Sequence, residues 1–365
     1  MPNISDRFVR SEILRLLPYH VPPSSGMIKL DAMENPYSLP DVLRKEIAQL
    51  VAAITTNRYP DSSCASLKAI LCETMEVPSE MDIILGNGSD EIIQIIALSL
   101  AKPGAILMSI EPSFIMFRMI AAYTNMKYVG IPLRANFELD LDFMLEAILK
   151  HQPAVIFIAY PNNPTGTYLN RVDMMELRKK LRSDILLVVD DAYCEYIKDP
   201  NFSSGIKLFS KSRNVLITRT FSKIYGLAGL RIGWGYSSKE IIQKLYEIKP
   251  PFNVSRPALF AATQAVQDIK WLDKAIKHNN YWSEKIFEVL YEIGVATNRT
   301  NVNFFLLNFD FVNQSASKVF NKLANSGILV RQMDVYGIKN SLRVTIGNSK
   351  ENKKFISVLR RIFNV

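Results

Sequence analysis

Residues 154–190 read AVIFIAYPNNPTGTYLNRVDMMELRKKLRSDILLVVD and form one complete predicted strand–helix–strand unit. The runs 154–159 and 185–190 are short, apolar and rich in β-branched residues, which is typical of strands buried on both faces. Between them, residues 172–181 carry apolar side chains at helical spacing. Two parallel strands joined by a crossover helix are the repeating unit of an α/β sheet. The segment therefore predicts an α/β fold with a mostly parallel central sheet.

The same alternation continues on both sides of this unit. Further strands are predicted at 83–85, 105–109, 127–131, 214–219 and 231–236, and further helices at 89–101, 113–123 and 141–150. The run 257–293 is long and helical, and 303–310, 328–331 and 342–346 are predicted strands of a separate small sheet. Residues 1–40 are irregular and rich in proline, and they are long for a structureless arm unless they wrap around another part. We therefore expect a large domain over 41–255 and a smaller, discontinuous α+β domain made of 1–40 and 256–365.

Composition limits the classes of protein to which the chain can belong. Lys and Arg number 44 against 35 Asp and Glu, a formal net charge of +9, but the basic residues are spread along the chain. We therefore expect no nucleic-acid partner. The most apolar stretch, 92–110, is interrupted by Gln94, Lys102 and Pro103, so no membrane partner is expected. The 3 His and 3 Cys residues form no metal-binding pattern, and the unpatterned cysteines favour the cytoplasm.

Polar groups follow several of the predicted strands, and in an α/β sheet ligands bind beyond the carboxyl ends of the strands. Residues 86–91 (GNGSDE) form a glycine-rich turn into a helix, where free backbone N–H groups suit a phosphate, although a plain capped turn has the same pattern. Residues 160–166 (YPNNPTG) form a rigid turn that presents asparagine side chains. Asp190 ends a hydrophobic strand, so its carboxylate is expected to be desolvated and to need a cationic partner.

The densest group of chemically active residues is TFSKIYGLAGLRIGW, residues 220–234. Lys223 follows a strand and lies among apolar and small residues, with Thr220 and Ser222 before it and Arg231 eight positions later. A lone lysine in a loop is usually solvated surface. An amine that is desolvated in this setting has its pKa lowered toward about 7 to 8 and serves as a nucleophile and a base.

Taken together, these segments resemble the fold-type I pyridoxal-phosphate aminotransferases of class II, over nearly the whole chain. The matching segments, in the order of the family, are 17–19 (LPY), 29–37 (KLDAMENPY), 58–61 (RYPD), 88–91 (GSDE), 162–166 (NNPTG), 190–193 (DDAY), 221–223 (FSK) and 342–347 (LRVTIG). The resemblance is strongest to members that transfer an amino group from glutamate to imidazole-acetol phosphate, giving histidinol phosphate and 2-oxoglutarate in histidine biosynthesis. It implies pyridoxal 5′-phosphate as cofactor and a cytoplasmic homodimer with shared active sites.

Other functions stay open at this point. Within the same fold, the alternatives are an aromatic amino-acid aminotransferase and a phospho-amino-acid decarboxylase. From a different class, a basic binding protein that kept the fold without catalysis is the remaining alternative, and it predicts no cofactor and salt-dependent retention of nucleic acid.

The resemblance also implies roles for residues around the cofactor ring. Lys223 would bind the cofactor covalently and afterwards carry a proton between the substrate and the cofactor. Asp190 would pair with the pyridine nitrogen, and Tyr193 and Asn163 would hydrogen-bond the ring oxygen O3′. Phe114 would stack on the ring face. Lys223, Asp190 and Tyr193 are the expected catalytic residues.

Further residues are implied for the phosphate and the substrates. The phosphate would be held by Ser89, Asp90, Thr220, Ser222 and Arg231, together with Tyr59 from the partner subunit. The resemblance assigns the α-carboxylate of the amino donor to Arg343 and the second anionic group of the substrates to Arg331. Tyr19, Asn35 and Asn163 are expected to contact or cover the substrate.

Two residues depart from the pattern of the family. Met33 stands where asparagine is more usual, and Asp191 stands where glutamate is more usual. We expect Met33 to affect the substrate side of the site and Asp191 to act behind Asp190.

Overall fold

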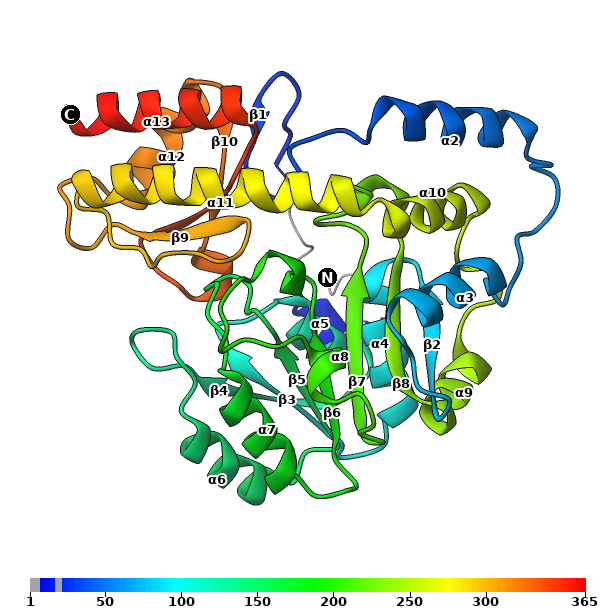
Figure 1. Ribbon diagram of the computed structural model, residues 1–365. Coiled ribbons are helices and arrows are strands. Elements are labelled where there is room, and N and C mark those ends of the chain that lie inside the picture. The colour runs from blue at the N-terminus through cyan, green and yellow to red at the C-terminus, as the bar shows by residue number, and fades with distance from the viewer. Residues whose placement is uncertain (1–6, 17–21) are drawn as a thin grey trace.

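The computed structural model describes residues 7–16 and 22–365 of the chain. Figure 1 shows a large sheet with helices on both faces and, beside it, a second group of helices and short strands. The long helix α11 (Ile269–Glu292) runs along both groups. No helix in the described part of the chain combines the length and the apolar character that a membrane crossing requires.

The large sheet has seven strands, six of which run in one direction. They are β2 (Met81–Gly86), β3 (Ile106–Glu111), β4 (Lys127–Pro132), β5 (Val155–Ala159), β6 (Leu186–Asp190), β7 (Val215–Thr220) and β8 (Gly233–Ser238). Their order is β2-β8-β7-β6-β5-β3-β4, and only β8 is antiparallel to its neighbours. The predicted α/β fold with a mostly parallel sheet is confirmed, and each predicted strand lies within two residues of the observed one at either end.

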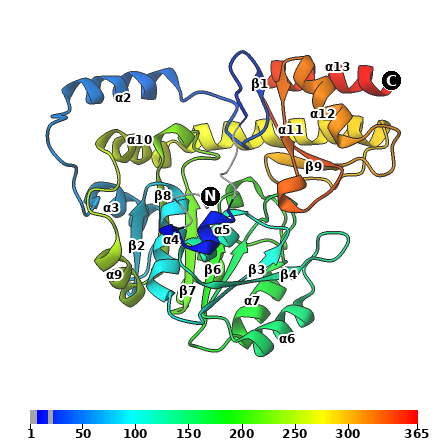
Figure 2. The ribbon, with the colours of Figure 1, turned by 180° about the vertical axis from the view of Figure 1, so that it is seen from behind.

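Both faces of this sheet are buried, which explains the continuous apolar runs. In β5, Ile156 and Ile158 belong to one core, whereas Val155 and Phe157 belong to another on the opposite face. Successive side chains of a strand point to opposite faces, so a strand covered on both sides has no polar alternation. The helices α3 (Ala65–Thr74), α6 (Leu141–His151), α7 (Arg171–Lys180), α8 (Gly205–Leu208) and α10 (Arg256–Gln267) contribute to the first core, and α4 (Gly88–Leu100), α5 (Met116–Tyr123) and α9 (Lys239–Ile248) to the second. Figure 2 shows the sheet from the side of α4 and α5.

Several helices begin at a residue that caps them. The Asp140 carboxylate accepts from the backbone N–H of Phe143 at the start of α6, and Asn170 accepts from two backbone N–H groups at the start of α7. Ser255 caps α10, and Asn348 forms a capping box with Glu351 at the start of α13 (Ser349–Phe363). Such caps satisfy backbone donors that have no partner inside the helix.

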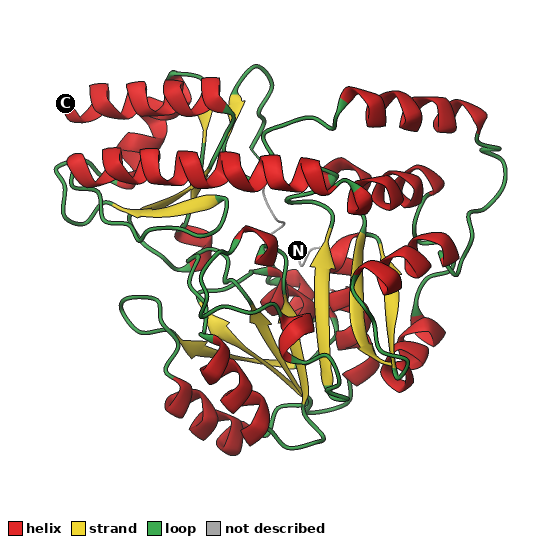
Figure 3. Ribbon diagram, viewed as in Figure 1, coloured by secondary structure: helices red, strands yellow, loops and turns green. Residues whose placement is uncertain are grey.

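The second group of elements has its own hydrophobic core, which includes Leu30, Trp282, Phe305 and Phe355. Its strands β9 (Phe304–Asn308), β11 (Arg331–Gln332) and β12 (Ser341–Thr345) form an antiparallel sheet in the order β11-β12-β9. The helices α11, α12 (Ala316–Asn325) and α13 cover it (Figure 3). Because α11 contributes to both cores, with Ala275 in the first and Trp282 in the second, it joins the two groups. The domain division at residues 41–255 remains a proposal.

The arm and the C-terminal strands differ from the sequence prediction in detail. The arm contains α1 (Ser11–Leu14) and the strand β1 (Ile28–Lys29), which pairs in parallel with β10 (Ile328–Leu329). The predicted strand at 328–331 is therefore divided: β10 bonds to β1, and β11 bonds to β12. The remaining helix, α2 (Asp41–Ala53), packs against α10.

Candidate active site

The strand ends that carry polar residues meet at one edge of the large sheet. Ala159 is the neighbour of Asp190 in the β5–β6 register, and Thr220 and Gly86 are both neighbours of Gly233, the first residue of the reversed strand β8. The turns after β2, β5, β6 and β7 and the turn before β8 therefore lie at the same edge. This is the edge at which the sequence predicts the site.

Lys223 lies in the loop that follows β7 and is partly buried. Its Nζ donates a hydrogen bond to the carbonyl of Ala32 at 3.2 Å and lies 5.6 Å from the centre of the Tyr193 ring. Burial and the positive charge of Arg343 together lower the pKa of Lys223 to about 8, against the opposing effect of the carboxylates of Asp90, Glu34 and Asp190. Near neutral pH the uncharged amine, which is the nucleophilic form, is thus far more abundant than in an exposed lysine.

Asp190, the last residue of β6, is buried beneath the site. Its Oδ1 accepts a hydrogen bond from the Thr218 hydroxyl at 3.0 Å. Burial raises the pKa of the Asp190 carboxyl to about 7, against the opposing effects of Thr218 and of the charge on Lys223. A buried carboxyl with this pKa favours a partner that brings a proton or a positive charge.

Tyr193 and Asn163 face the same region from two different loops. The Tyr193 hydroxyl donates to the sulfur of Met33 at 3.1 Å, and its ring meets Phe304 edge-on with centroids 5.3 Å apart. Burial raises the pKa of Tyr193, so it stays a neutral donor. The Asn163 Oδ1 accepts from Arg343 at 2.6 Å.

The loop after β5 is held in shape by its other asparagine. Asn162 donates to the Pro112 carbonyl at 2.9 Å and to the Thr165 hydroxyl at 2.8 Å, and it accepts from the Ser113 hydroxyl at 2.7 Å. These bonds join the loops after β3 and β5. Phe114, in the first of these loops, is half-buried and contacts Phe117 edge-on.

A cradle of donors lies between the start of α4 and the start of β8. The guanidinium of Arg231 donates to the Ser222 hydroxyl and to the Asp90 carboxylate, both at 3.3 Å. Gly88 has a φ of +77°, and a Cβ added there would lie 2.6 Å from Arg231 Nη2. The guanidinium therefore passes over the turn only because residue 88 has no side chain. Thr220 orders the adjacent loop by accepting from the Ser222 backbone N–H at 3.1 Å.

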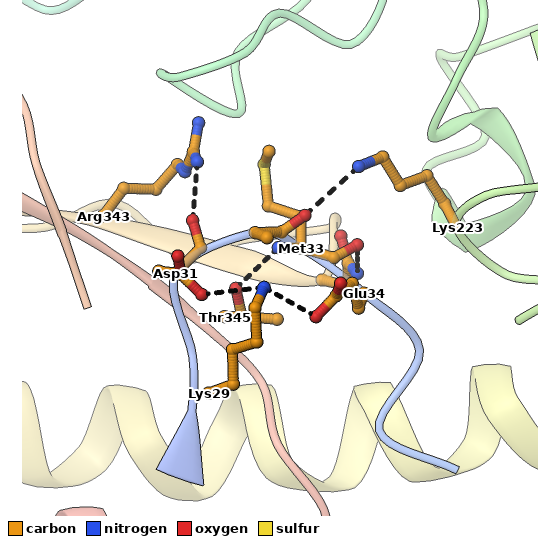
Figure 4. Close-up of polar contacts among 9 residues, drawn as sticks. Lys29, Asp31, Met33, Glu34, Lys223, Arg343 and Thr345 are labelled. Carbon is orange, nitrogen blue, oxygen red and sulfur yellow. Dashed lines mark hydrogen bonds and ion pairs between the residues drawn. The ribbon is translucent and has the colours of Figure 1, made fainter. Parts of the chain in front are cut away.

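The segment 31–34 crosses the site and touches three of the predicted residues in succession, and Figure 4 shows its contacts with Arg343 and Lys223. The Asp31 carbonyl accepts from Arg343, the Ala32 carbonyl accepts from Lys223, and the Met33 sulfur accepts from Tyr193. We call residues 31–34 the strap. The sequence predicts no such contact for residues 31 and 32, because main-chain carbonyls leave no signal in the identity of a side chain.

The strap is pinned on its other side by the second group of elements. The Met33 backbone N–H donates to the Thr345 hydroxyl at 2.9 Å, and the Met33 carbonyl accepts from Asn303 at 3.0 Å. Met33 has a φ of +54°, a backbone conformation that costs free energy for a side chain of this size. These buried contacts therefore hold a conformation that the isolated segment would not favour.

Arg331 and Arg343 lie side by side on adjacent strands. They are direct partners in the antiparallel register of β11 and β12, so their side chains leave the same face of that sheet. Both are at least nine-tenths buried. Arg343 is held by the Asn163 side chain and the Asp31 carbonyl, and its Nε has no partner among the described residues. Paired guanidinium groups of this kind are suited to anions.

Two predicted residues make contacts other than those expected, and a third lies outside the described residues. Asn35 donates to the Ile224 carbonyl at 2.7 Å, so it packs on the loop that carries Lys223. Tyr59 is 75% exposed and stacks on Phe252, with ring centroids 4.5 Å apart. Tyr19 lies outside the described residues.

A group of charged residues near Asp190 includes Glu195 and Arg219, for which the sequence predicts no role. Arg219 forms an ion pair with Glu195 and lies over the ring of Trp234. Burial raises the pKa of Asp191 to about 8, against the effect of Arg219, and its Oδ2 accepts from the Gly205 backbone N–H at 2.7 Å. The role of Asp191 behind Asp190 remains a prediction, and the available signal for the group was an arginine inside the buried strand β7.

Comparison with known proteins identifies the family of the chain over nearly its whole length. Residues 25–359 match the family model described as aminotransferase class I and II. A histidinol-phosphate aminotransferase from Pelagibacter ubique is 41% identical over 93% of this chain and 93% of its own length, and one from Chromobacterium violaceum is 38% identical over 98% of each. Among solved structures, histidinol-phosphate aminotransferase from Sinorhizobium meliloti in complex with pyridoxal-5′-phosphate has a TM-score of 0.87 at 23% identity, over 98% of both chains, and shares the fold. The chain therefore belongs to the class I and II aminotransferase family, in which its relatives over nearly the full length are histidinol-phosphate aminotransferases.

Proposed function

We propose that this chain transfers an amino group from glutamate to imidazole-acetol phosphate, giving histidinol phosphate and 2-oxoglutarate, with pyridoxal 5′-phosphate as cofactor. The observation that carries the proposal is that Arg331 and Arg343 are buried neighbours on adjacent strands and that Arg343 and Lys223 bond to successive carbonyls of the strap. Glutamate and 2-oxoglutarate bear two carboxylates each, and histidinol phosphate and imidazole-acetol phosphate bear a phosphate each, so every proposed substrate offers an anion to two adjacent guanidinium groups.

The residues present fit the cofactor. The cradle of Arg231, Ser222 and the first backbone N–H groups of α4 suits a phosphate dianion, since helix N-termini and guanidinium groups both favour negative charge. The bare Gly88 leaves the space that this arrangement needs. Asp190 offers a buried carboxyl for a ring nitrogen, and Lys223 offers the amine that would hold the cofactor covalently.

When bound, pyridoxal phosphate supplies an electron-withdrawing ring that accepts the electron pair released when a substrate α-carbon loses its proton. Asp190 would hold a proton on the ring nitrogen, because a charged partner offsets the cost of burying its carboxylate. Lys223, with its lowered pKa, would take the proton from the substrate α-carbon and deliver it to the cofactor. Tyr193 and Asn163 would orient the ring oxygen, and Phe114 would cover one ring face.

The two arginines would divide the substrates between them. Arg343 would bind the α-carboxylate, since its guanidinium is already oriented by Asn163 and by the strap. Arg331, its neighbour on β11, would bind the substrate phosphate in one half-reaction and the side-chain carboxylate of glutamate in the other. Asn35 and Tyr19 would cover the substrate.

We further propose a homodimer in the cytoplasm. Tyr59 and Phe252 form a stacked aromatic pair of which Tyr59 is 75% exposed, and such a surface is typical of a contact with another chain. In the dimer Tyr59 would reach the phosphate of the partner subunit. The cysteines at 64, 72 and 194 are all free, which fits a reducing compartment.

The experiment that tests the reaction is a substrate profile of the purified protein with histidinol phosphate, phenylalanine and phosphothreonine. We expect histidinol phosphate to be preferred over phenylalanine by at least about a hundredfold in kcat/KM, because the side chain of phenylalanine offers no anionic group to Arg331. A preference for phenylalanine would assign an aromatic aminotransferase, and carbon dioxide release from phosphothreonine would assign a decarboxylase.

The cofactor is tested separately by borohydride reduction. The treated protein should carry pyridoxal phosphate fixed to Lys223, and Lys223→Ala should carry none. Lys274→Ala is a suitable control. Lys274 is on α11, where its amine lies over the rings of Tyr37 and Trp271, and it takes no part in the proposed site. A fixed cofactor in Lys223→Ala would refute the assignment.

A further inference from the structure

Glu91 binds the turn that forms the phosphate cradle without being part of the cradle. Its Oε2 accepts a hydrogen bond from the backbone N–H of Asn87 at 2.6 Å and another from the side-chain amide of Asn253 at 2.5 Å. Asn87 directly precedes α4, whose first residues are Gly88 and Ser89. A carboxylate this near to a proposed phosphate site is unfavourable by charge alone, so its presence calls for a structural reason.

The turn is folded closely over the Glu91 carboxylate. A Cβ added at Gly86 would lie 3.3 Å from Glu91 Oε2 and 2.7 Å from Ile92 Cγ1. Because the Asn87 N–H is committed to Glu91, the next backbone N–H groups, at Gly88 and Ser89, stay available at the helix end. The hydrogen bond of Glu91 therefore fixes which backbone donors face the cradle.

Asn253 connects this turn to a distant segment. Besides its bond to Glu91, its amide donates to the Leu85 carbonyl at 3.3 Å, and its Oδ1 accepts from Lys249 at 2.7 Å. The neighbouring Phe252 stacks on Tyr59, and Arg256 donates to the Tyr59 carbonyl at 2.8 Å. The segment 249–256 thus touches both the cradle turn and the chain around Tyr59.

We propose that Glu91 is a positioning residue for the phosphate-binding turn and that Asn253 joins this turn to the segment that bears the Tyr59 contact. The inference rests on the proposed function, in which the turn holds the phosphate of the cofactor. Glu91 orients the backbone N–H groups of the turn and makes no contact with the phosphate itself. Its removal should therefore weaken binding of ligands that carry a phosphate and spare those that lack it.

The test compares pyridoxal phosphate with pyridoxal, which has the same ring and aldehyde but no phosphate. Full-length protein freed of cofactor by dialysis is titrated with each, and dissociation constants are taken from the change in absorbance. We expect Glu91→Ala to weaken pyridoxal phosphate binding about tenfold to a hundredfold, as loss of a charged hydrogen-bond partner does, and to change pyridoxal binding less than about threefold. Glu91→Gln, whose amide oxygen can accept both bonds, should restore most of the affinity.

Two further variants keep the outcome decisive. Asn253→Ala retains the carboxylate and should weaken pyridoxal phosphate binding in the same selective way, so it replaces Glu91→Ala if that variant does not fold. Glu247→Ala removes an exposed carboxylate that pairs only with Lys244 among the described residues and should change neither constant. Equal loss of both ligands, or no loss of either, would overturn the role of Glu91. A wild-type protein that binds both ligands equally would instead refute the phosphate site, and with it the proposed function.

Discussion

At the scale of single residues, the chemistry of the site depends on two buried groups whose pKa values are moved toward neutrality by opposite routes. Lys223 is a base whose cationic form is disfavoured by burial and by Arg343, and Asp190 is an acid whose anionic form is disfavoured by burial. Burying the charged form of either group alone costs folding free energy. A bound ligand with a protonatable ring and an aldehyde would offset the cost for both groups, so we interpret the two groups as one site.

The contribution of Arg343 to the Lys223 pKa can be measured. Removing a positive charge near an ammonium group stabilises that group, so Arg343→Gln should raise the pKa of Lys223. The uncharged amine then becomes scarcer at neutral pH, and we expect capture of pyridoxal at pH 7 to slow about threefold to tenfold. The measurement is the rate of borohydride-trapped pyridoxal incorporation from pH 6 to pH 10. Arg299→Gln, which loses only an exposed pair with Glu284, is the control, and an unshifted profile in Arg343→Gln would contradict the prediction.

The cost of burying Asp190 predicts an unusual dependence of stability on pH. The pKa of Asp190 is about 7 in the folded protein and near 4 when unfolded, so the folded state binds the proton more tightly and the carboxyl destabilises the fold increasingly from pH 4 to pH 7. Without cofactor, Asp190→Asn should therefore be more stable than the wild type at pH 8, by up to about 4 kcal/mol, and equal to it near pH 4. Urea unfolding at both pH values measures this. Asp310→Asn is the opposite case, because hydrogen bonds from Asn340 and Asn308 lower the pKa of Asp310, and it should give no gain.

At the scale of elements, the sequence predicts best where burial is complete. The strands β5 and β6 lie between two cores, so every side chain in them before Asp190 is apolar, and the amino-acid sequence alone indicates their bounds. The strands β1 and β10 are two residues long and exist because they bond to each other across about 300 residues of chain, a pairing that local sequence does not encode. The same limit applies to the strap, whose contacts with Arg343 and Lys223 are made by main-chain carbonyls.

The candidate site divides in a similar way. Lys223, Asp190 and Arg231 follow or precede buried strands, so their convergence could be predicted from the topology of an α/β sheet. The Glu195–Arg219 pair and the Glu91–Asn253 contact could not, because each joins segments that are distant in the chain and local sequence does not indicate which segments meet. The role of Tyr59 remains a prediction, because its proposed contact is with a second chain.

The hydrogen bond between the strap and β12 of the second group of elements can be tested by mutation. Thr345, on β12, accepts the backbone N–H of Met33, and Thr345→Val would leave this buried donor without a partner. We expect a loss of stability of about 1 to 3 kcal/mol, together with a higher KM for glutamate and a smaller change in kcat, because the strap bonds to Arg343 and Lys223. Steady-state kinetics and thermal unfolding measure both effects. Thr263→Val removes a hydroxyl that bonds only within α10 among the described residues, and equal KM values in the two variants would contradict the role of the strap.

At the scale of the whole molecule, the net charge of +9 and the position of the cationic site are separate matters. Lys223 and Arg231 lie at one edge of the large sheet, and Arg331 and Arg343 lie on the small sheet. Most basic residues lie elsewhere, many in exposed pairs such as Arg182 with Asp184. Exposed pairs of this kind contribute little to stability. The surplus charge therefore describes the surface of the protein, whereas the proposed function depends on a few cations from both groups of elements.

The proposed dimer predicts that two different variant chains can restore one active site between them. If Tyr59 serves the phosphate site of its partner, a mixed dimer of Lys223→Ala and Tyr59→Ala chains contains one fully intact site: the lysine comes from the Tyr59→Ala chain and the tyrosine from the Lys223→Ala chain. We expect Lys223→Ala alone to be inactive and Tyr59→Ala alone to lose about tenfold in cofactor affinity, as removal of a hydrogen-bond donor to a charged group does. Co-expressed chains, assayed at limiting cofactor, should then exceed the activity of the same amount of Tyr59→Ala chains alone. If Tyr59 acts within its own subunit, the mixed dimer has no intact site and no activity is gained. The stacking of Tyr59 on Phe252 favours the first outcome, because it leaves the Tyr59 ring exposed at the surface of its own chain, where a second chain can contact it.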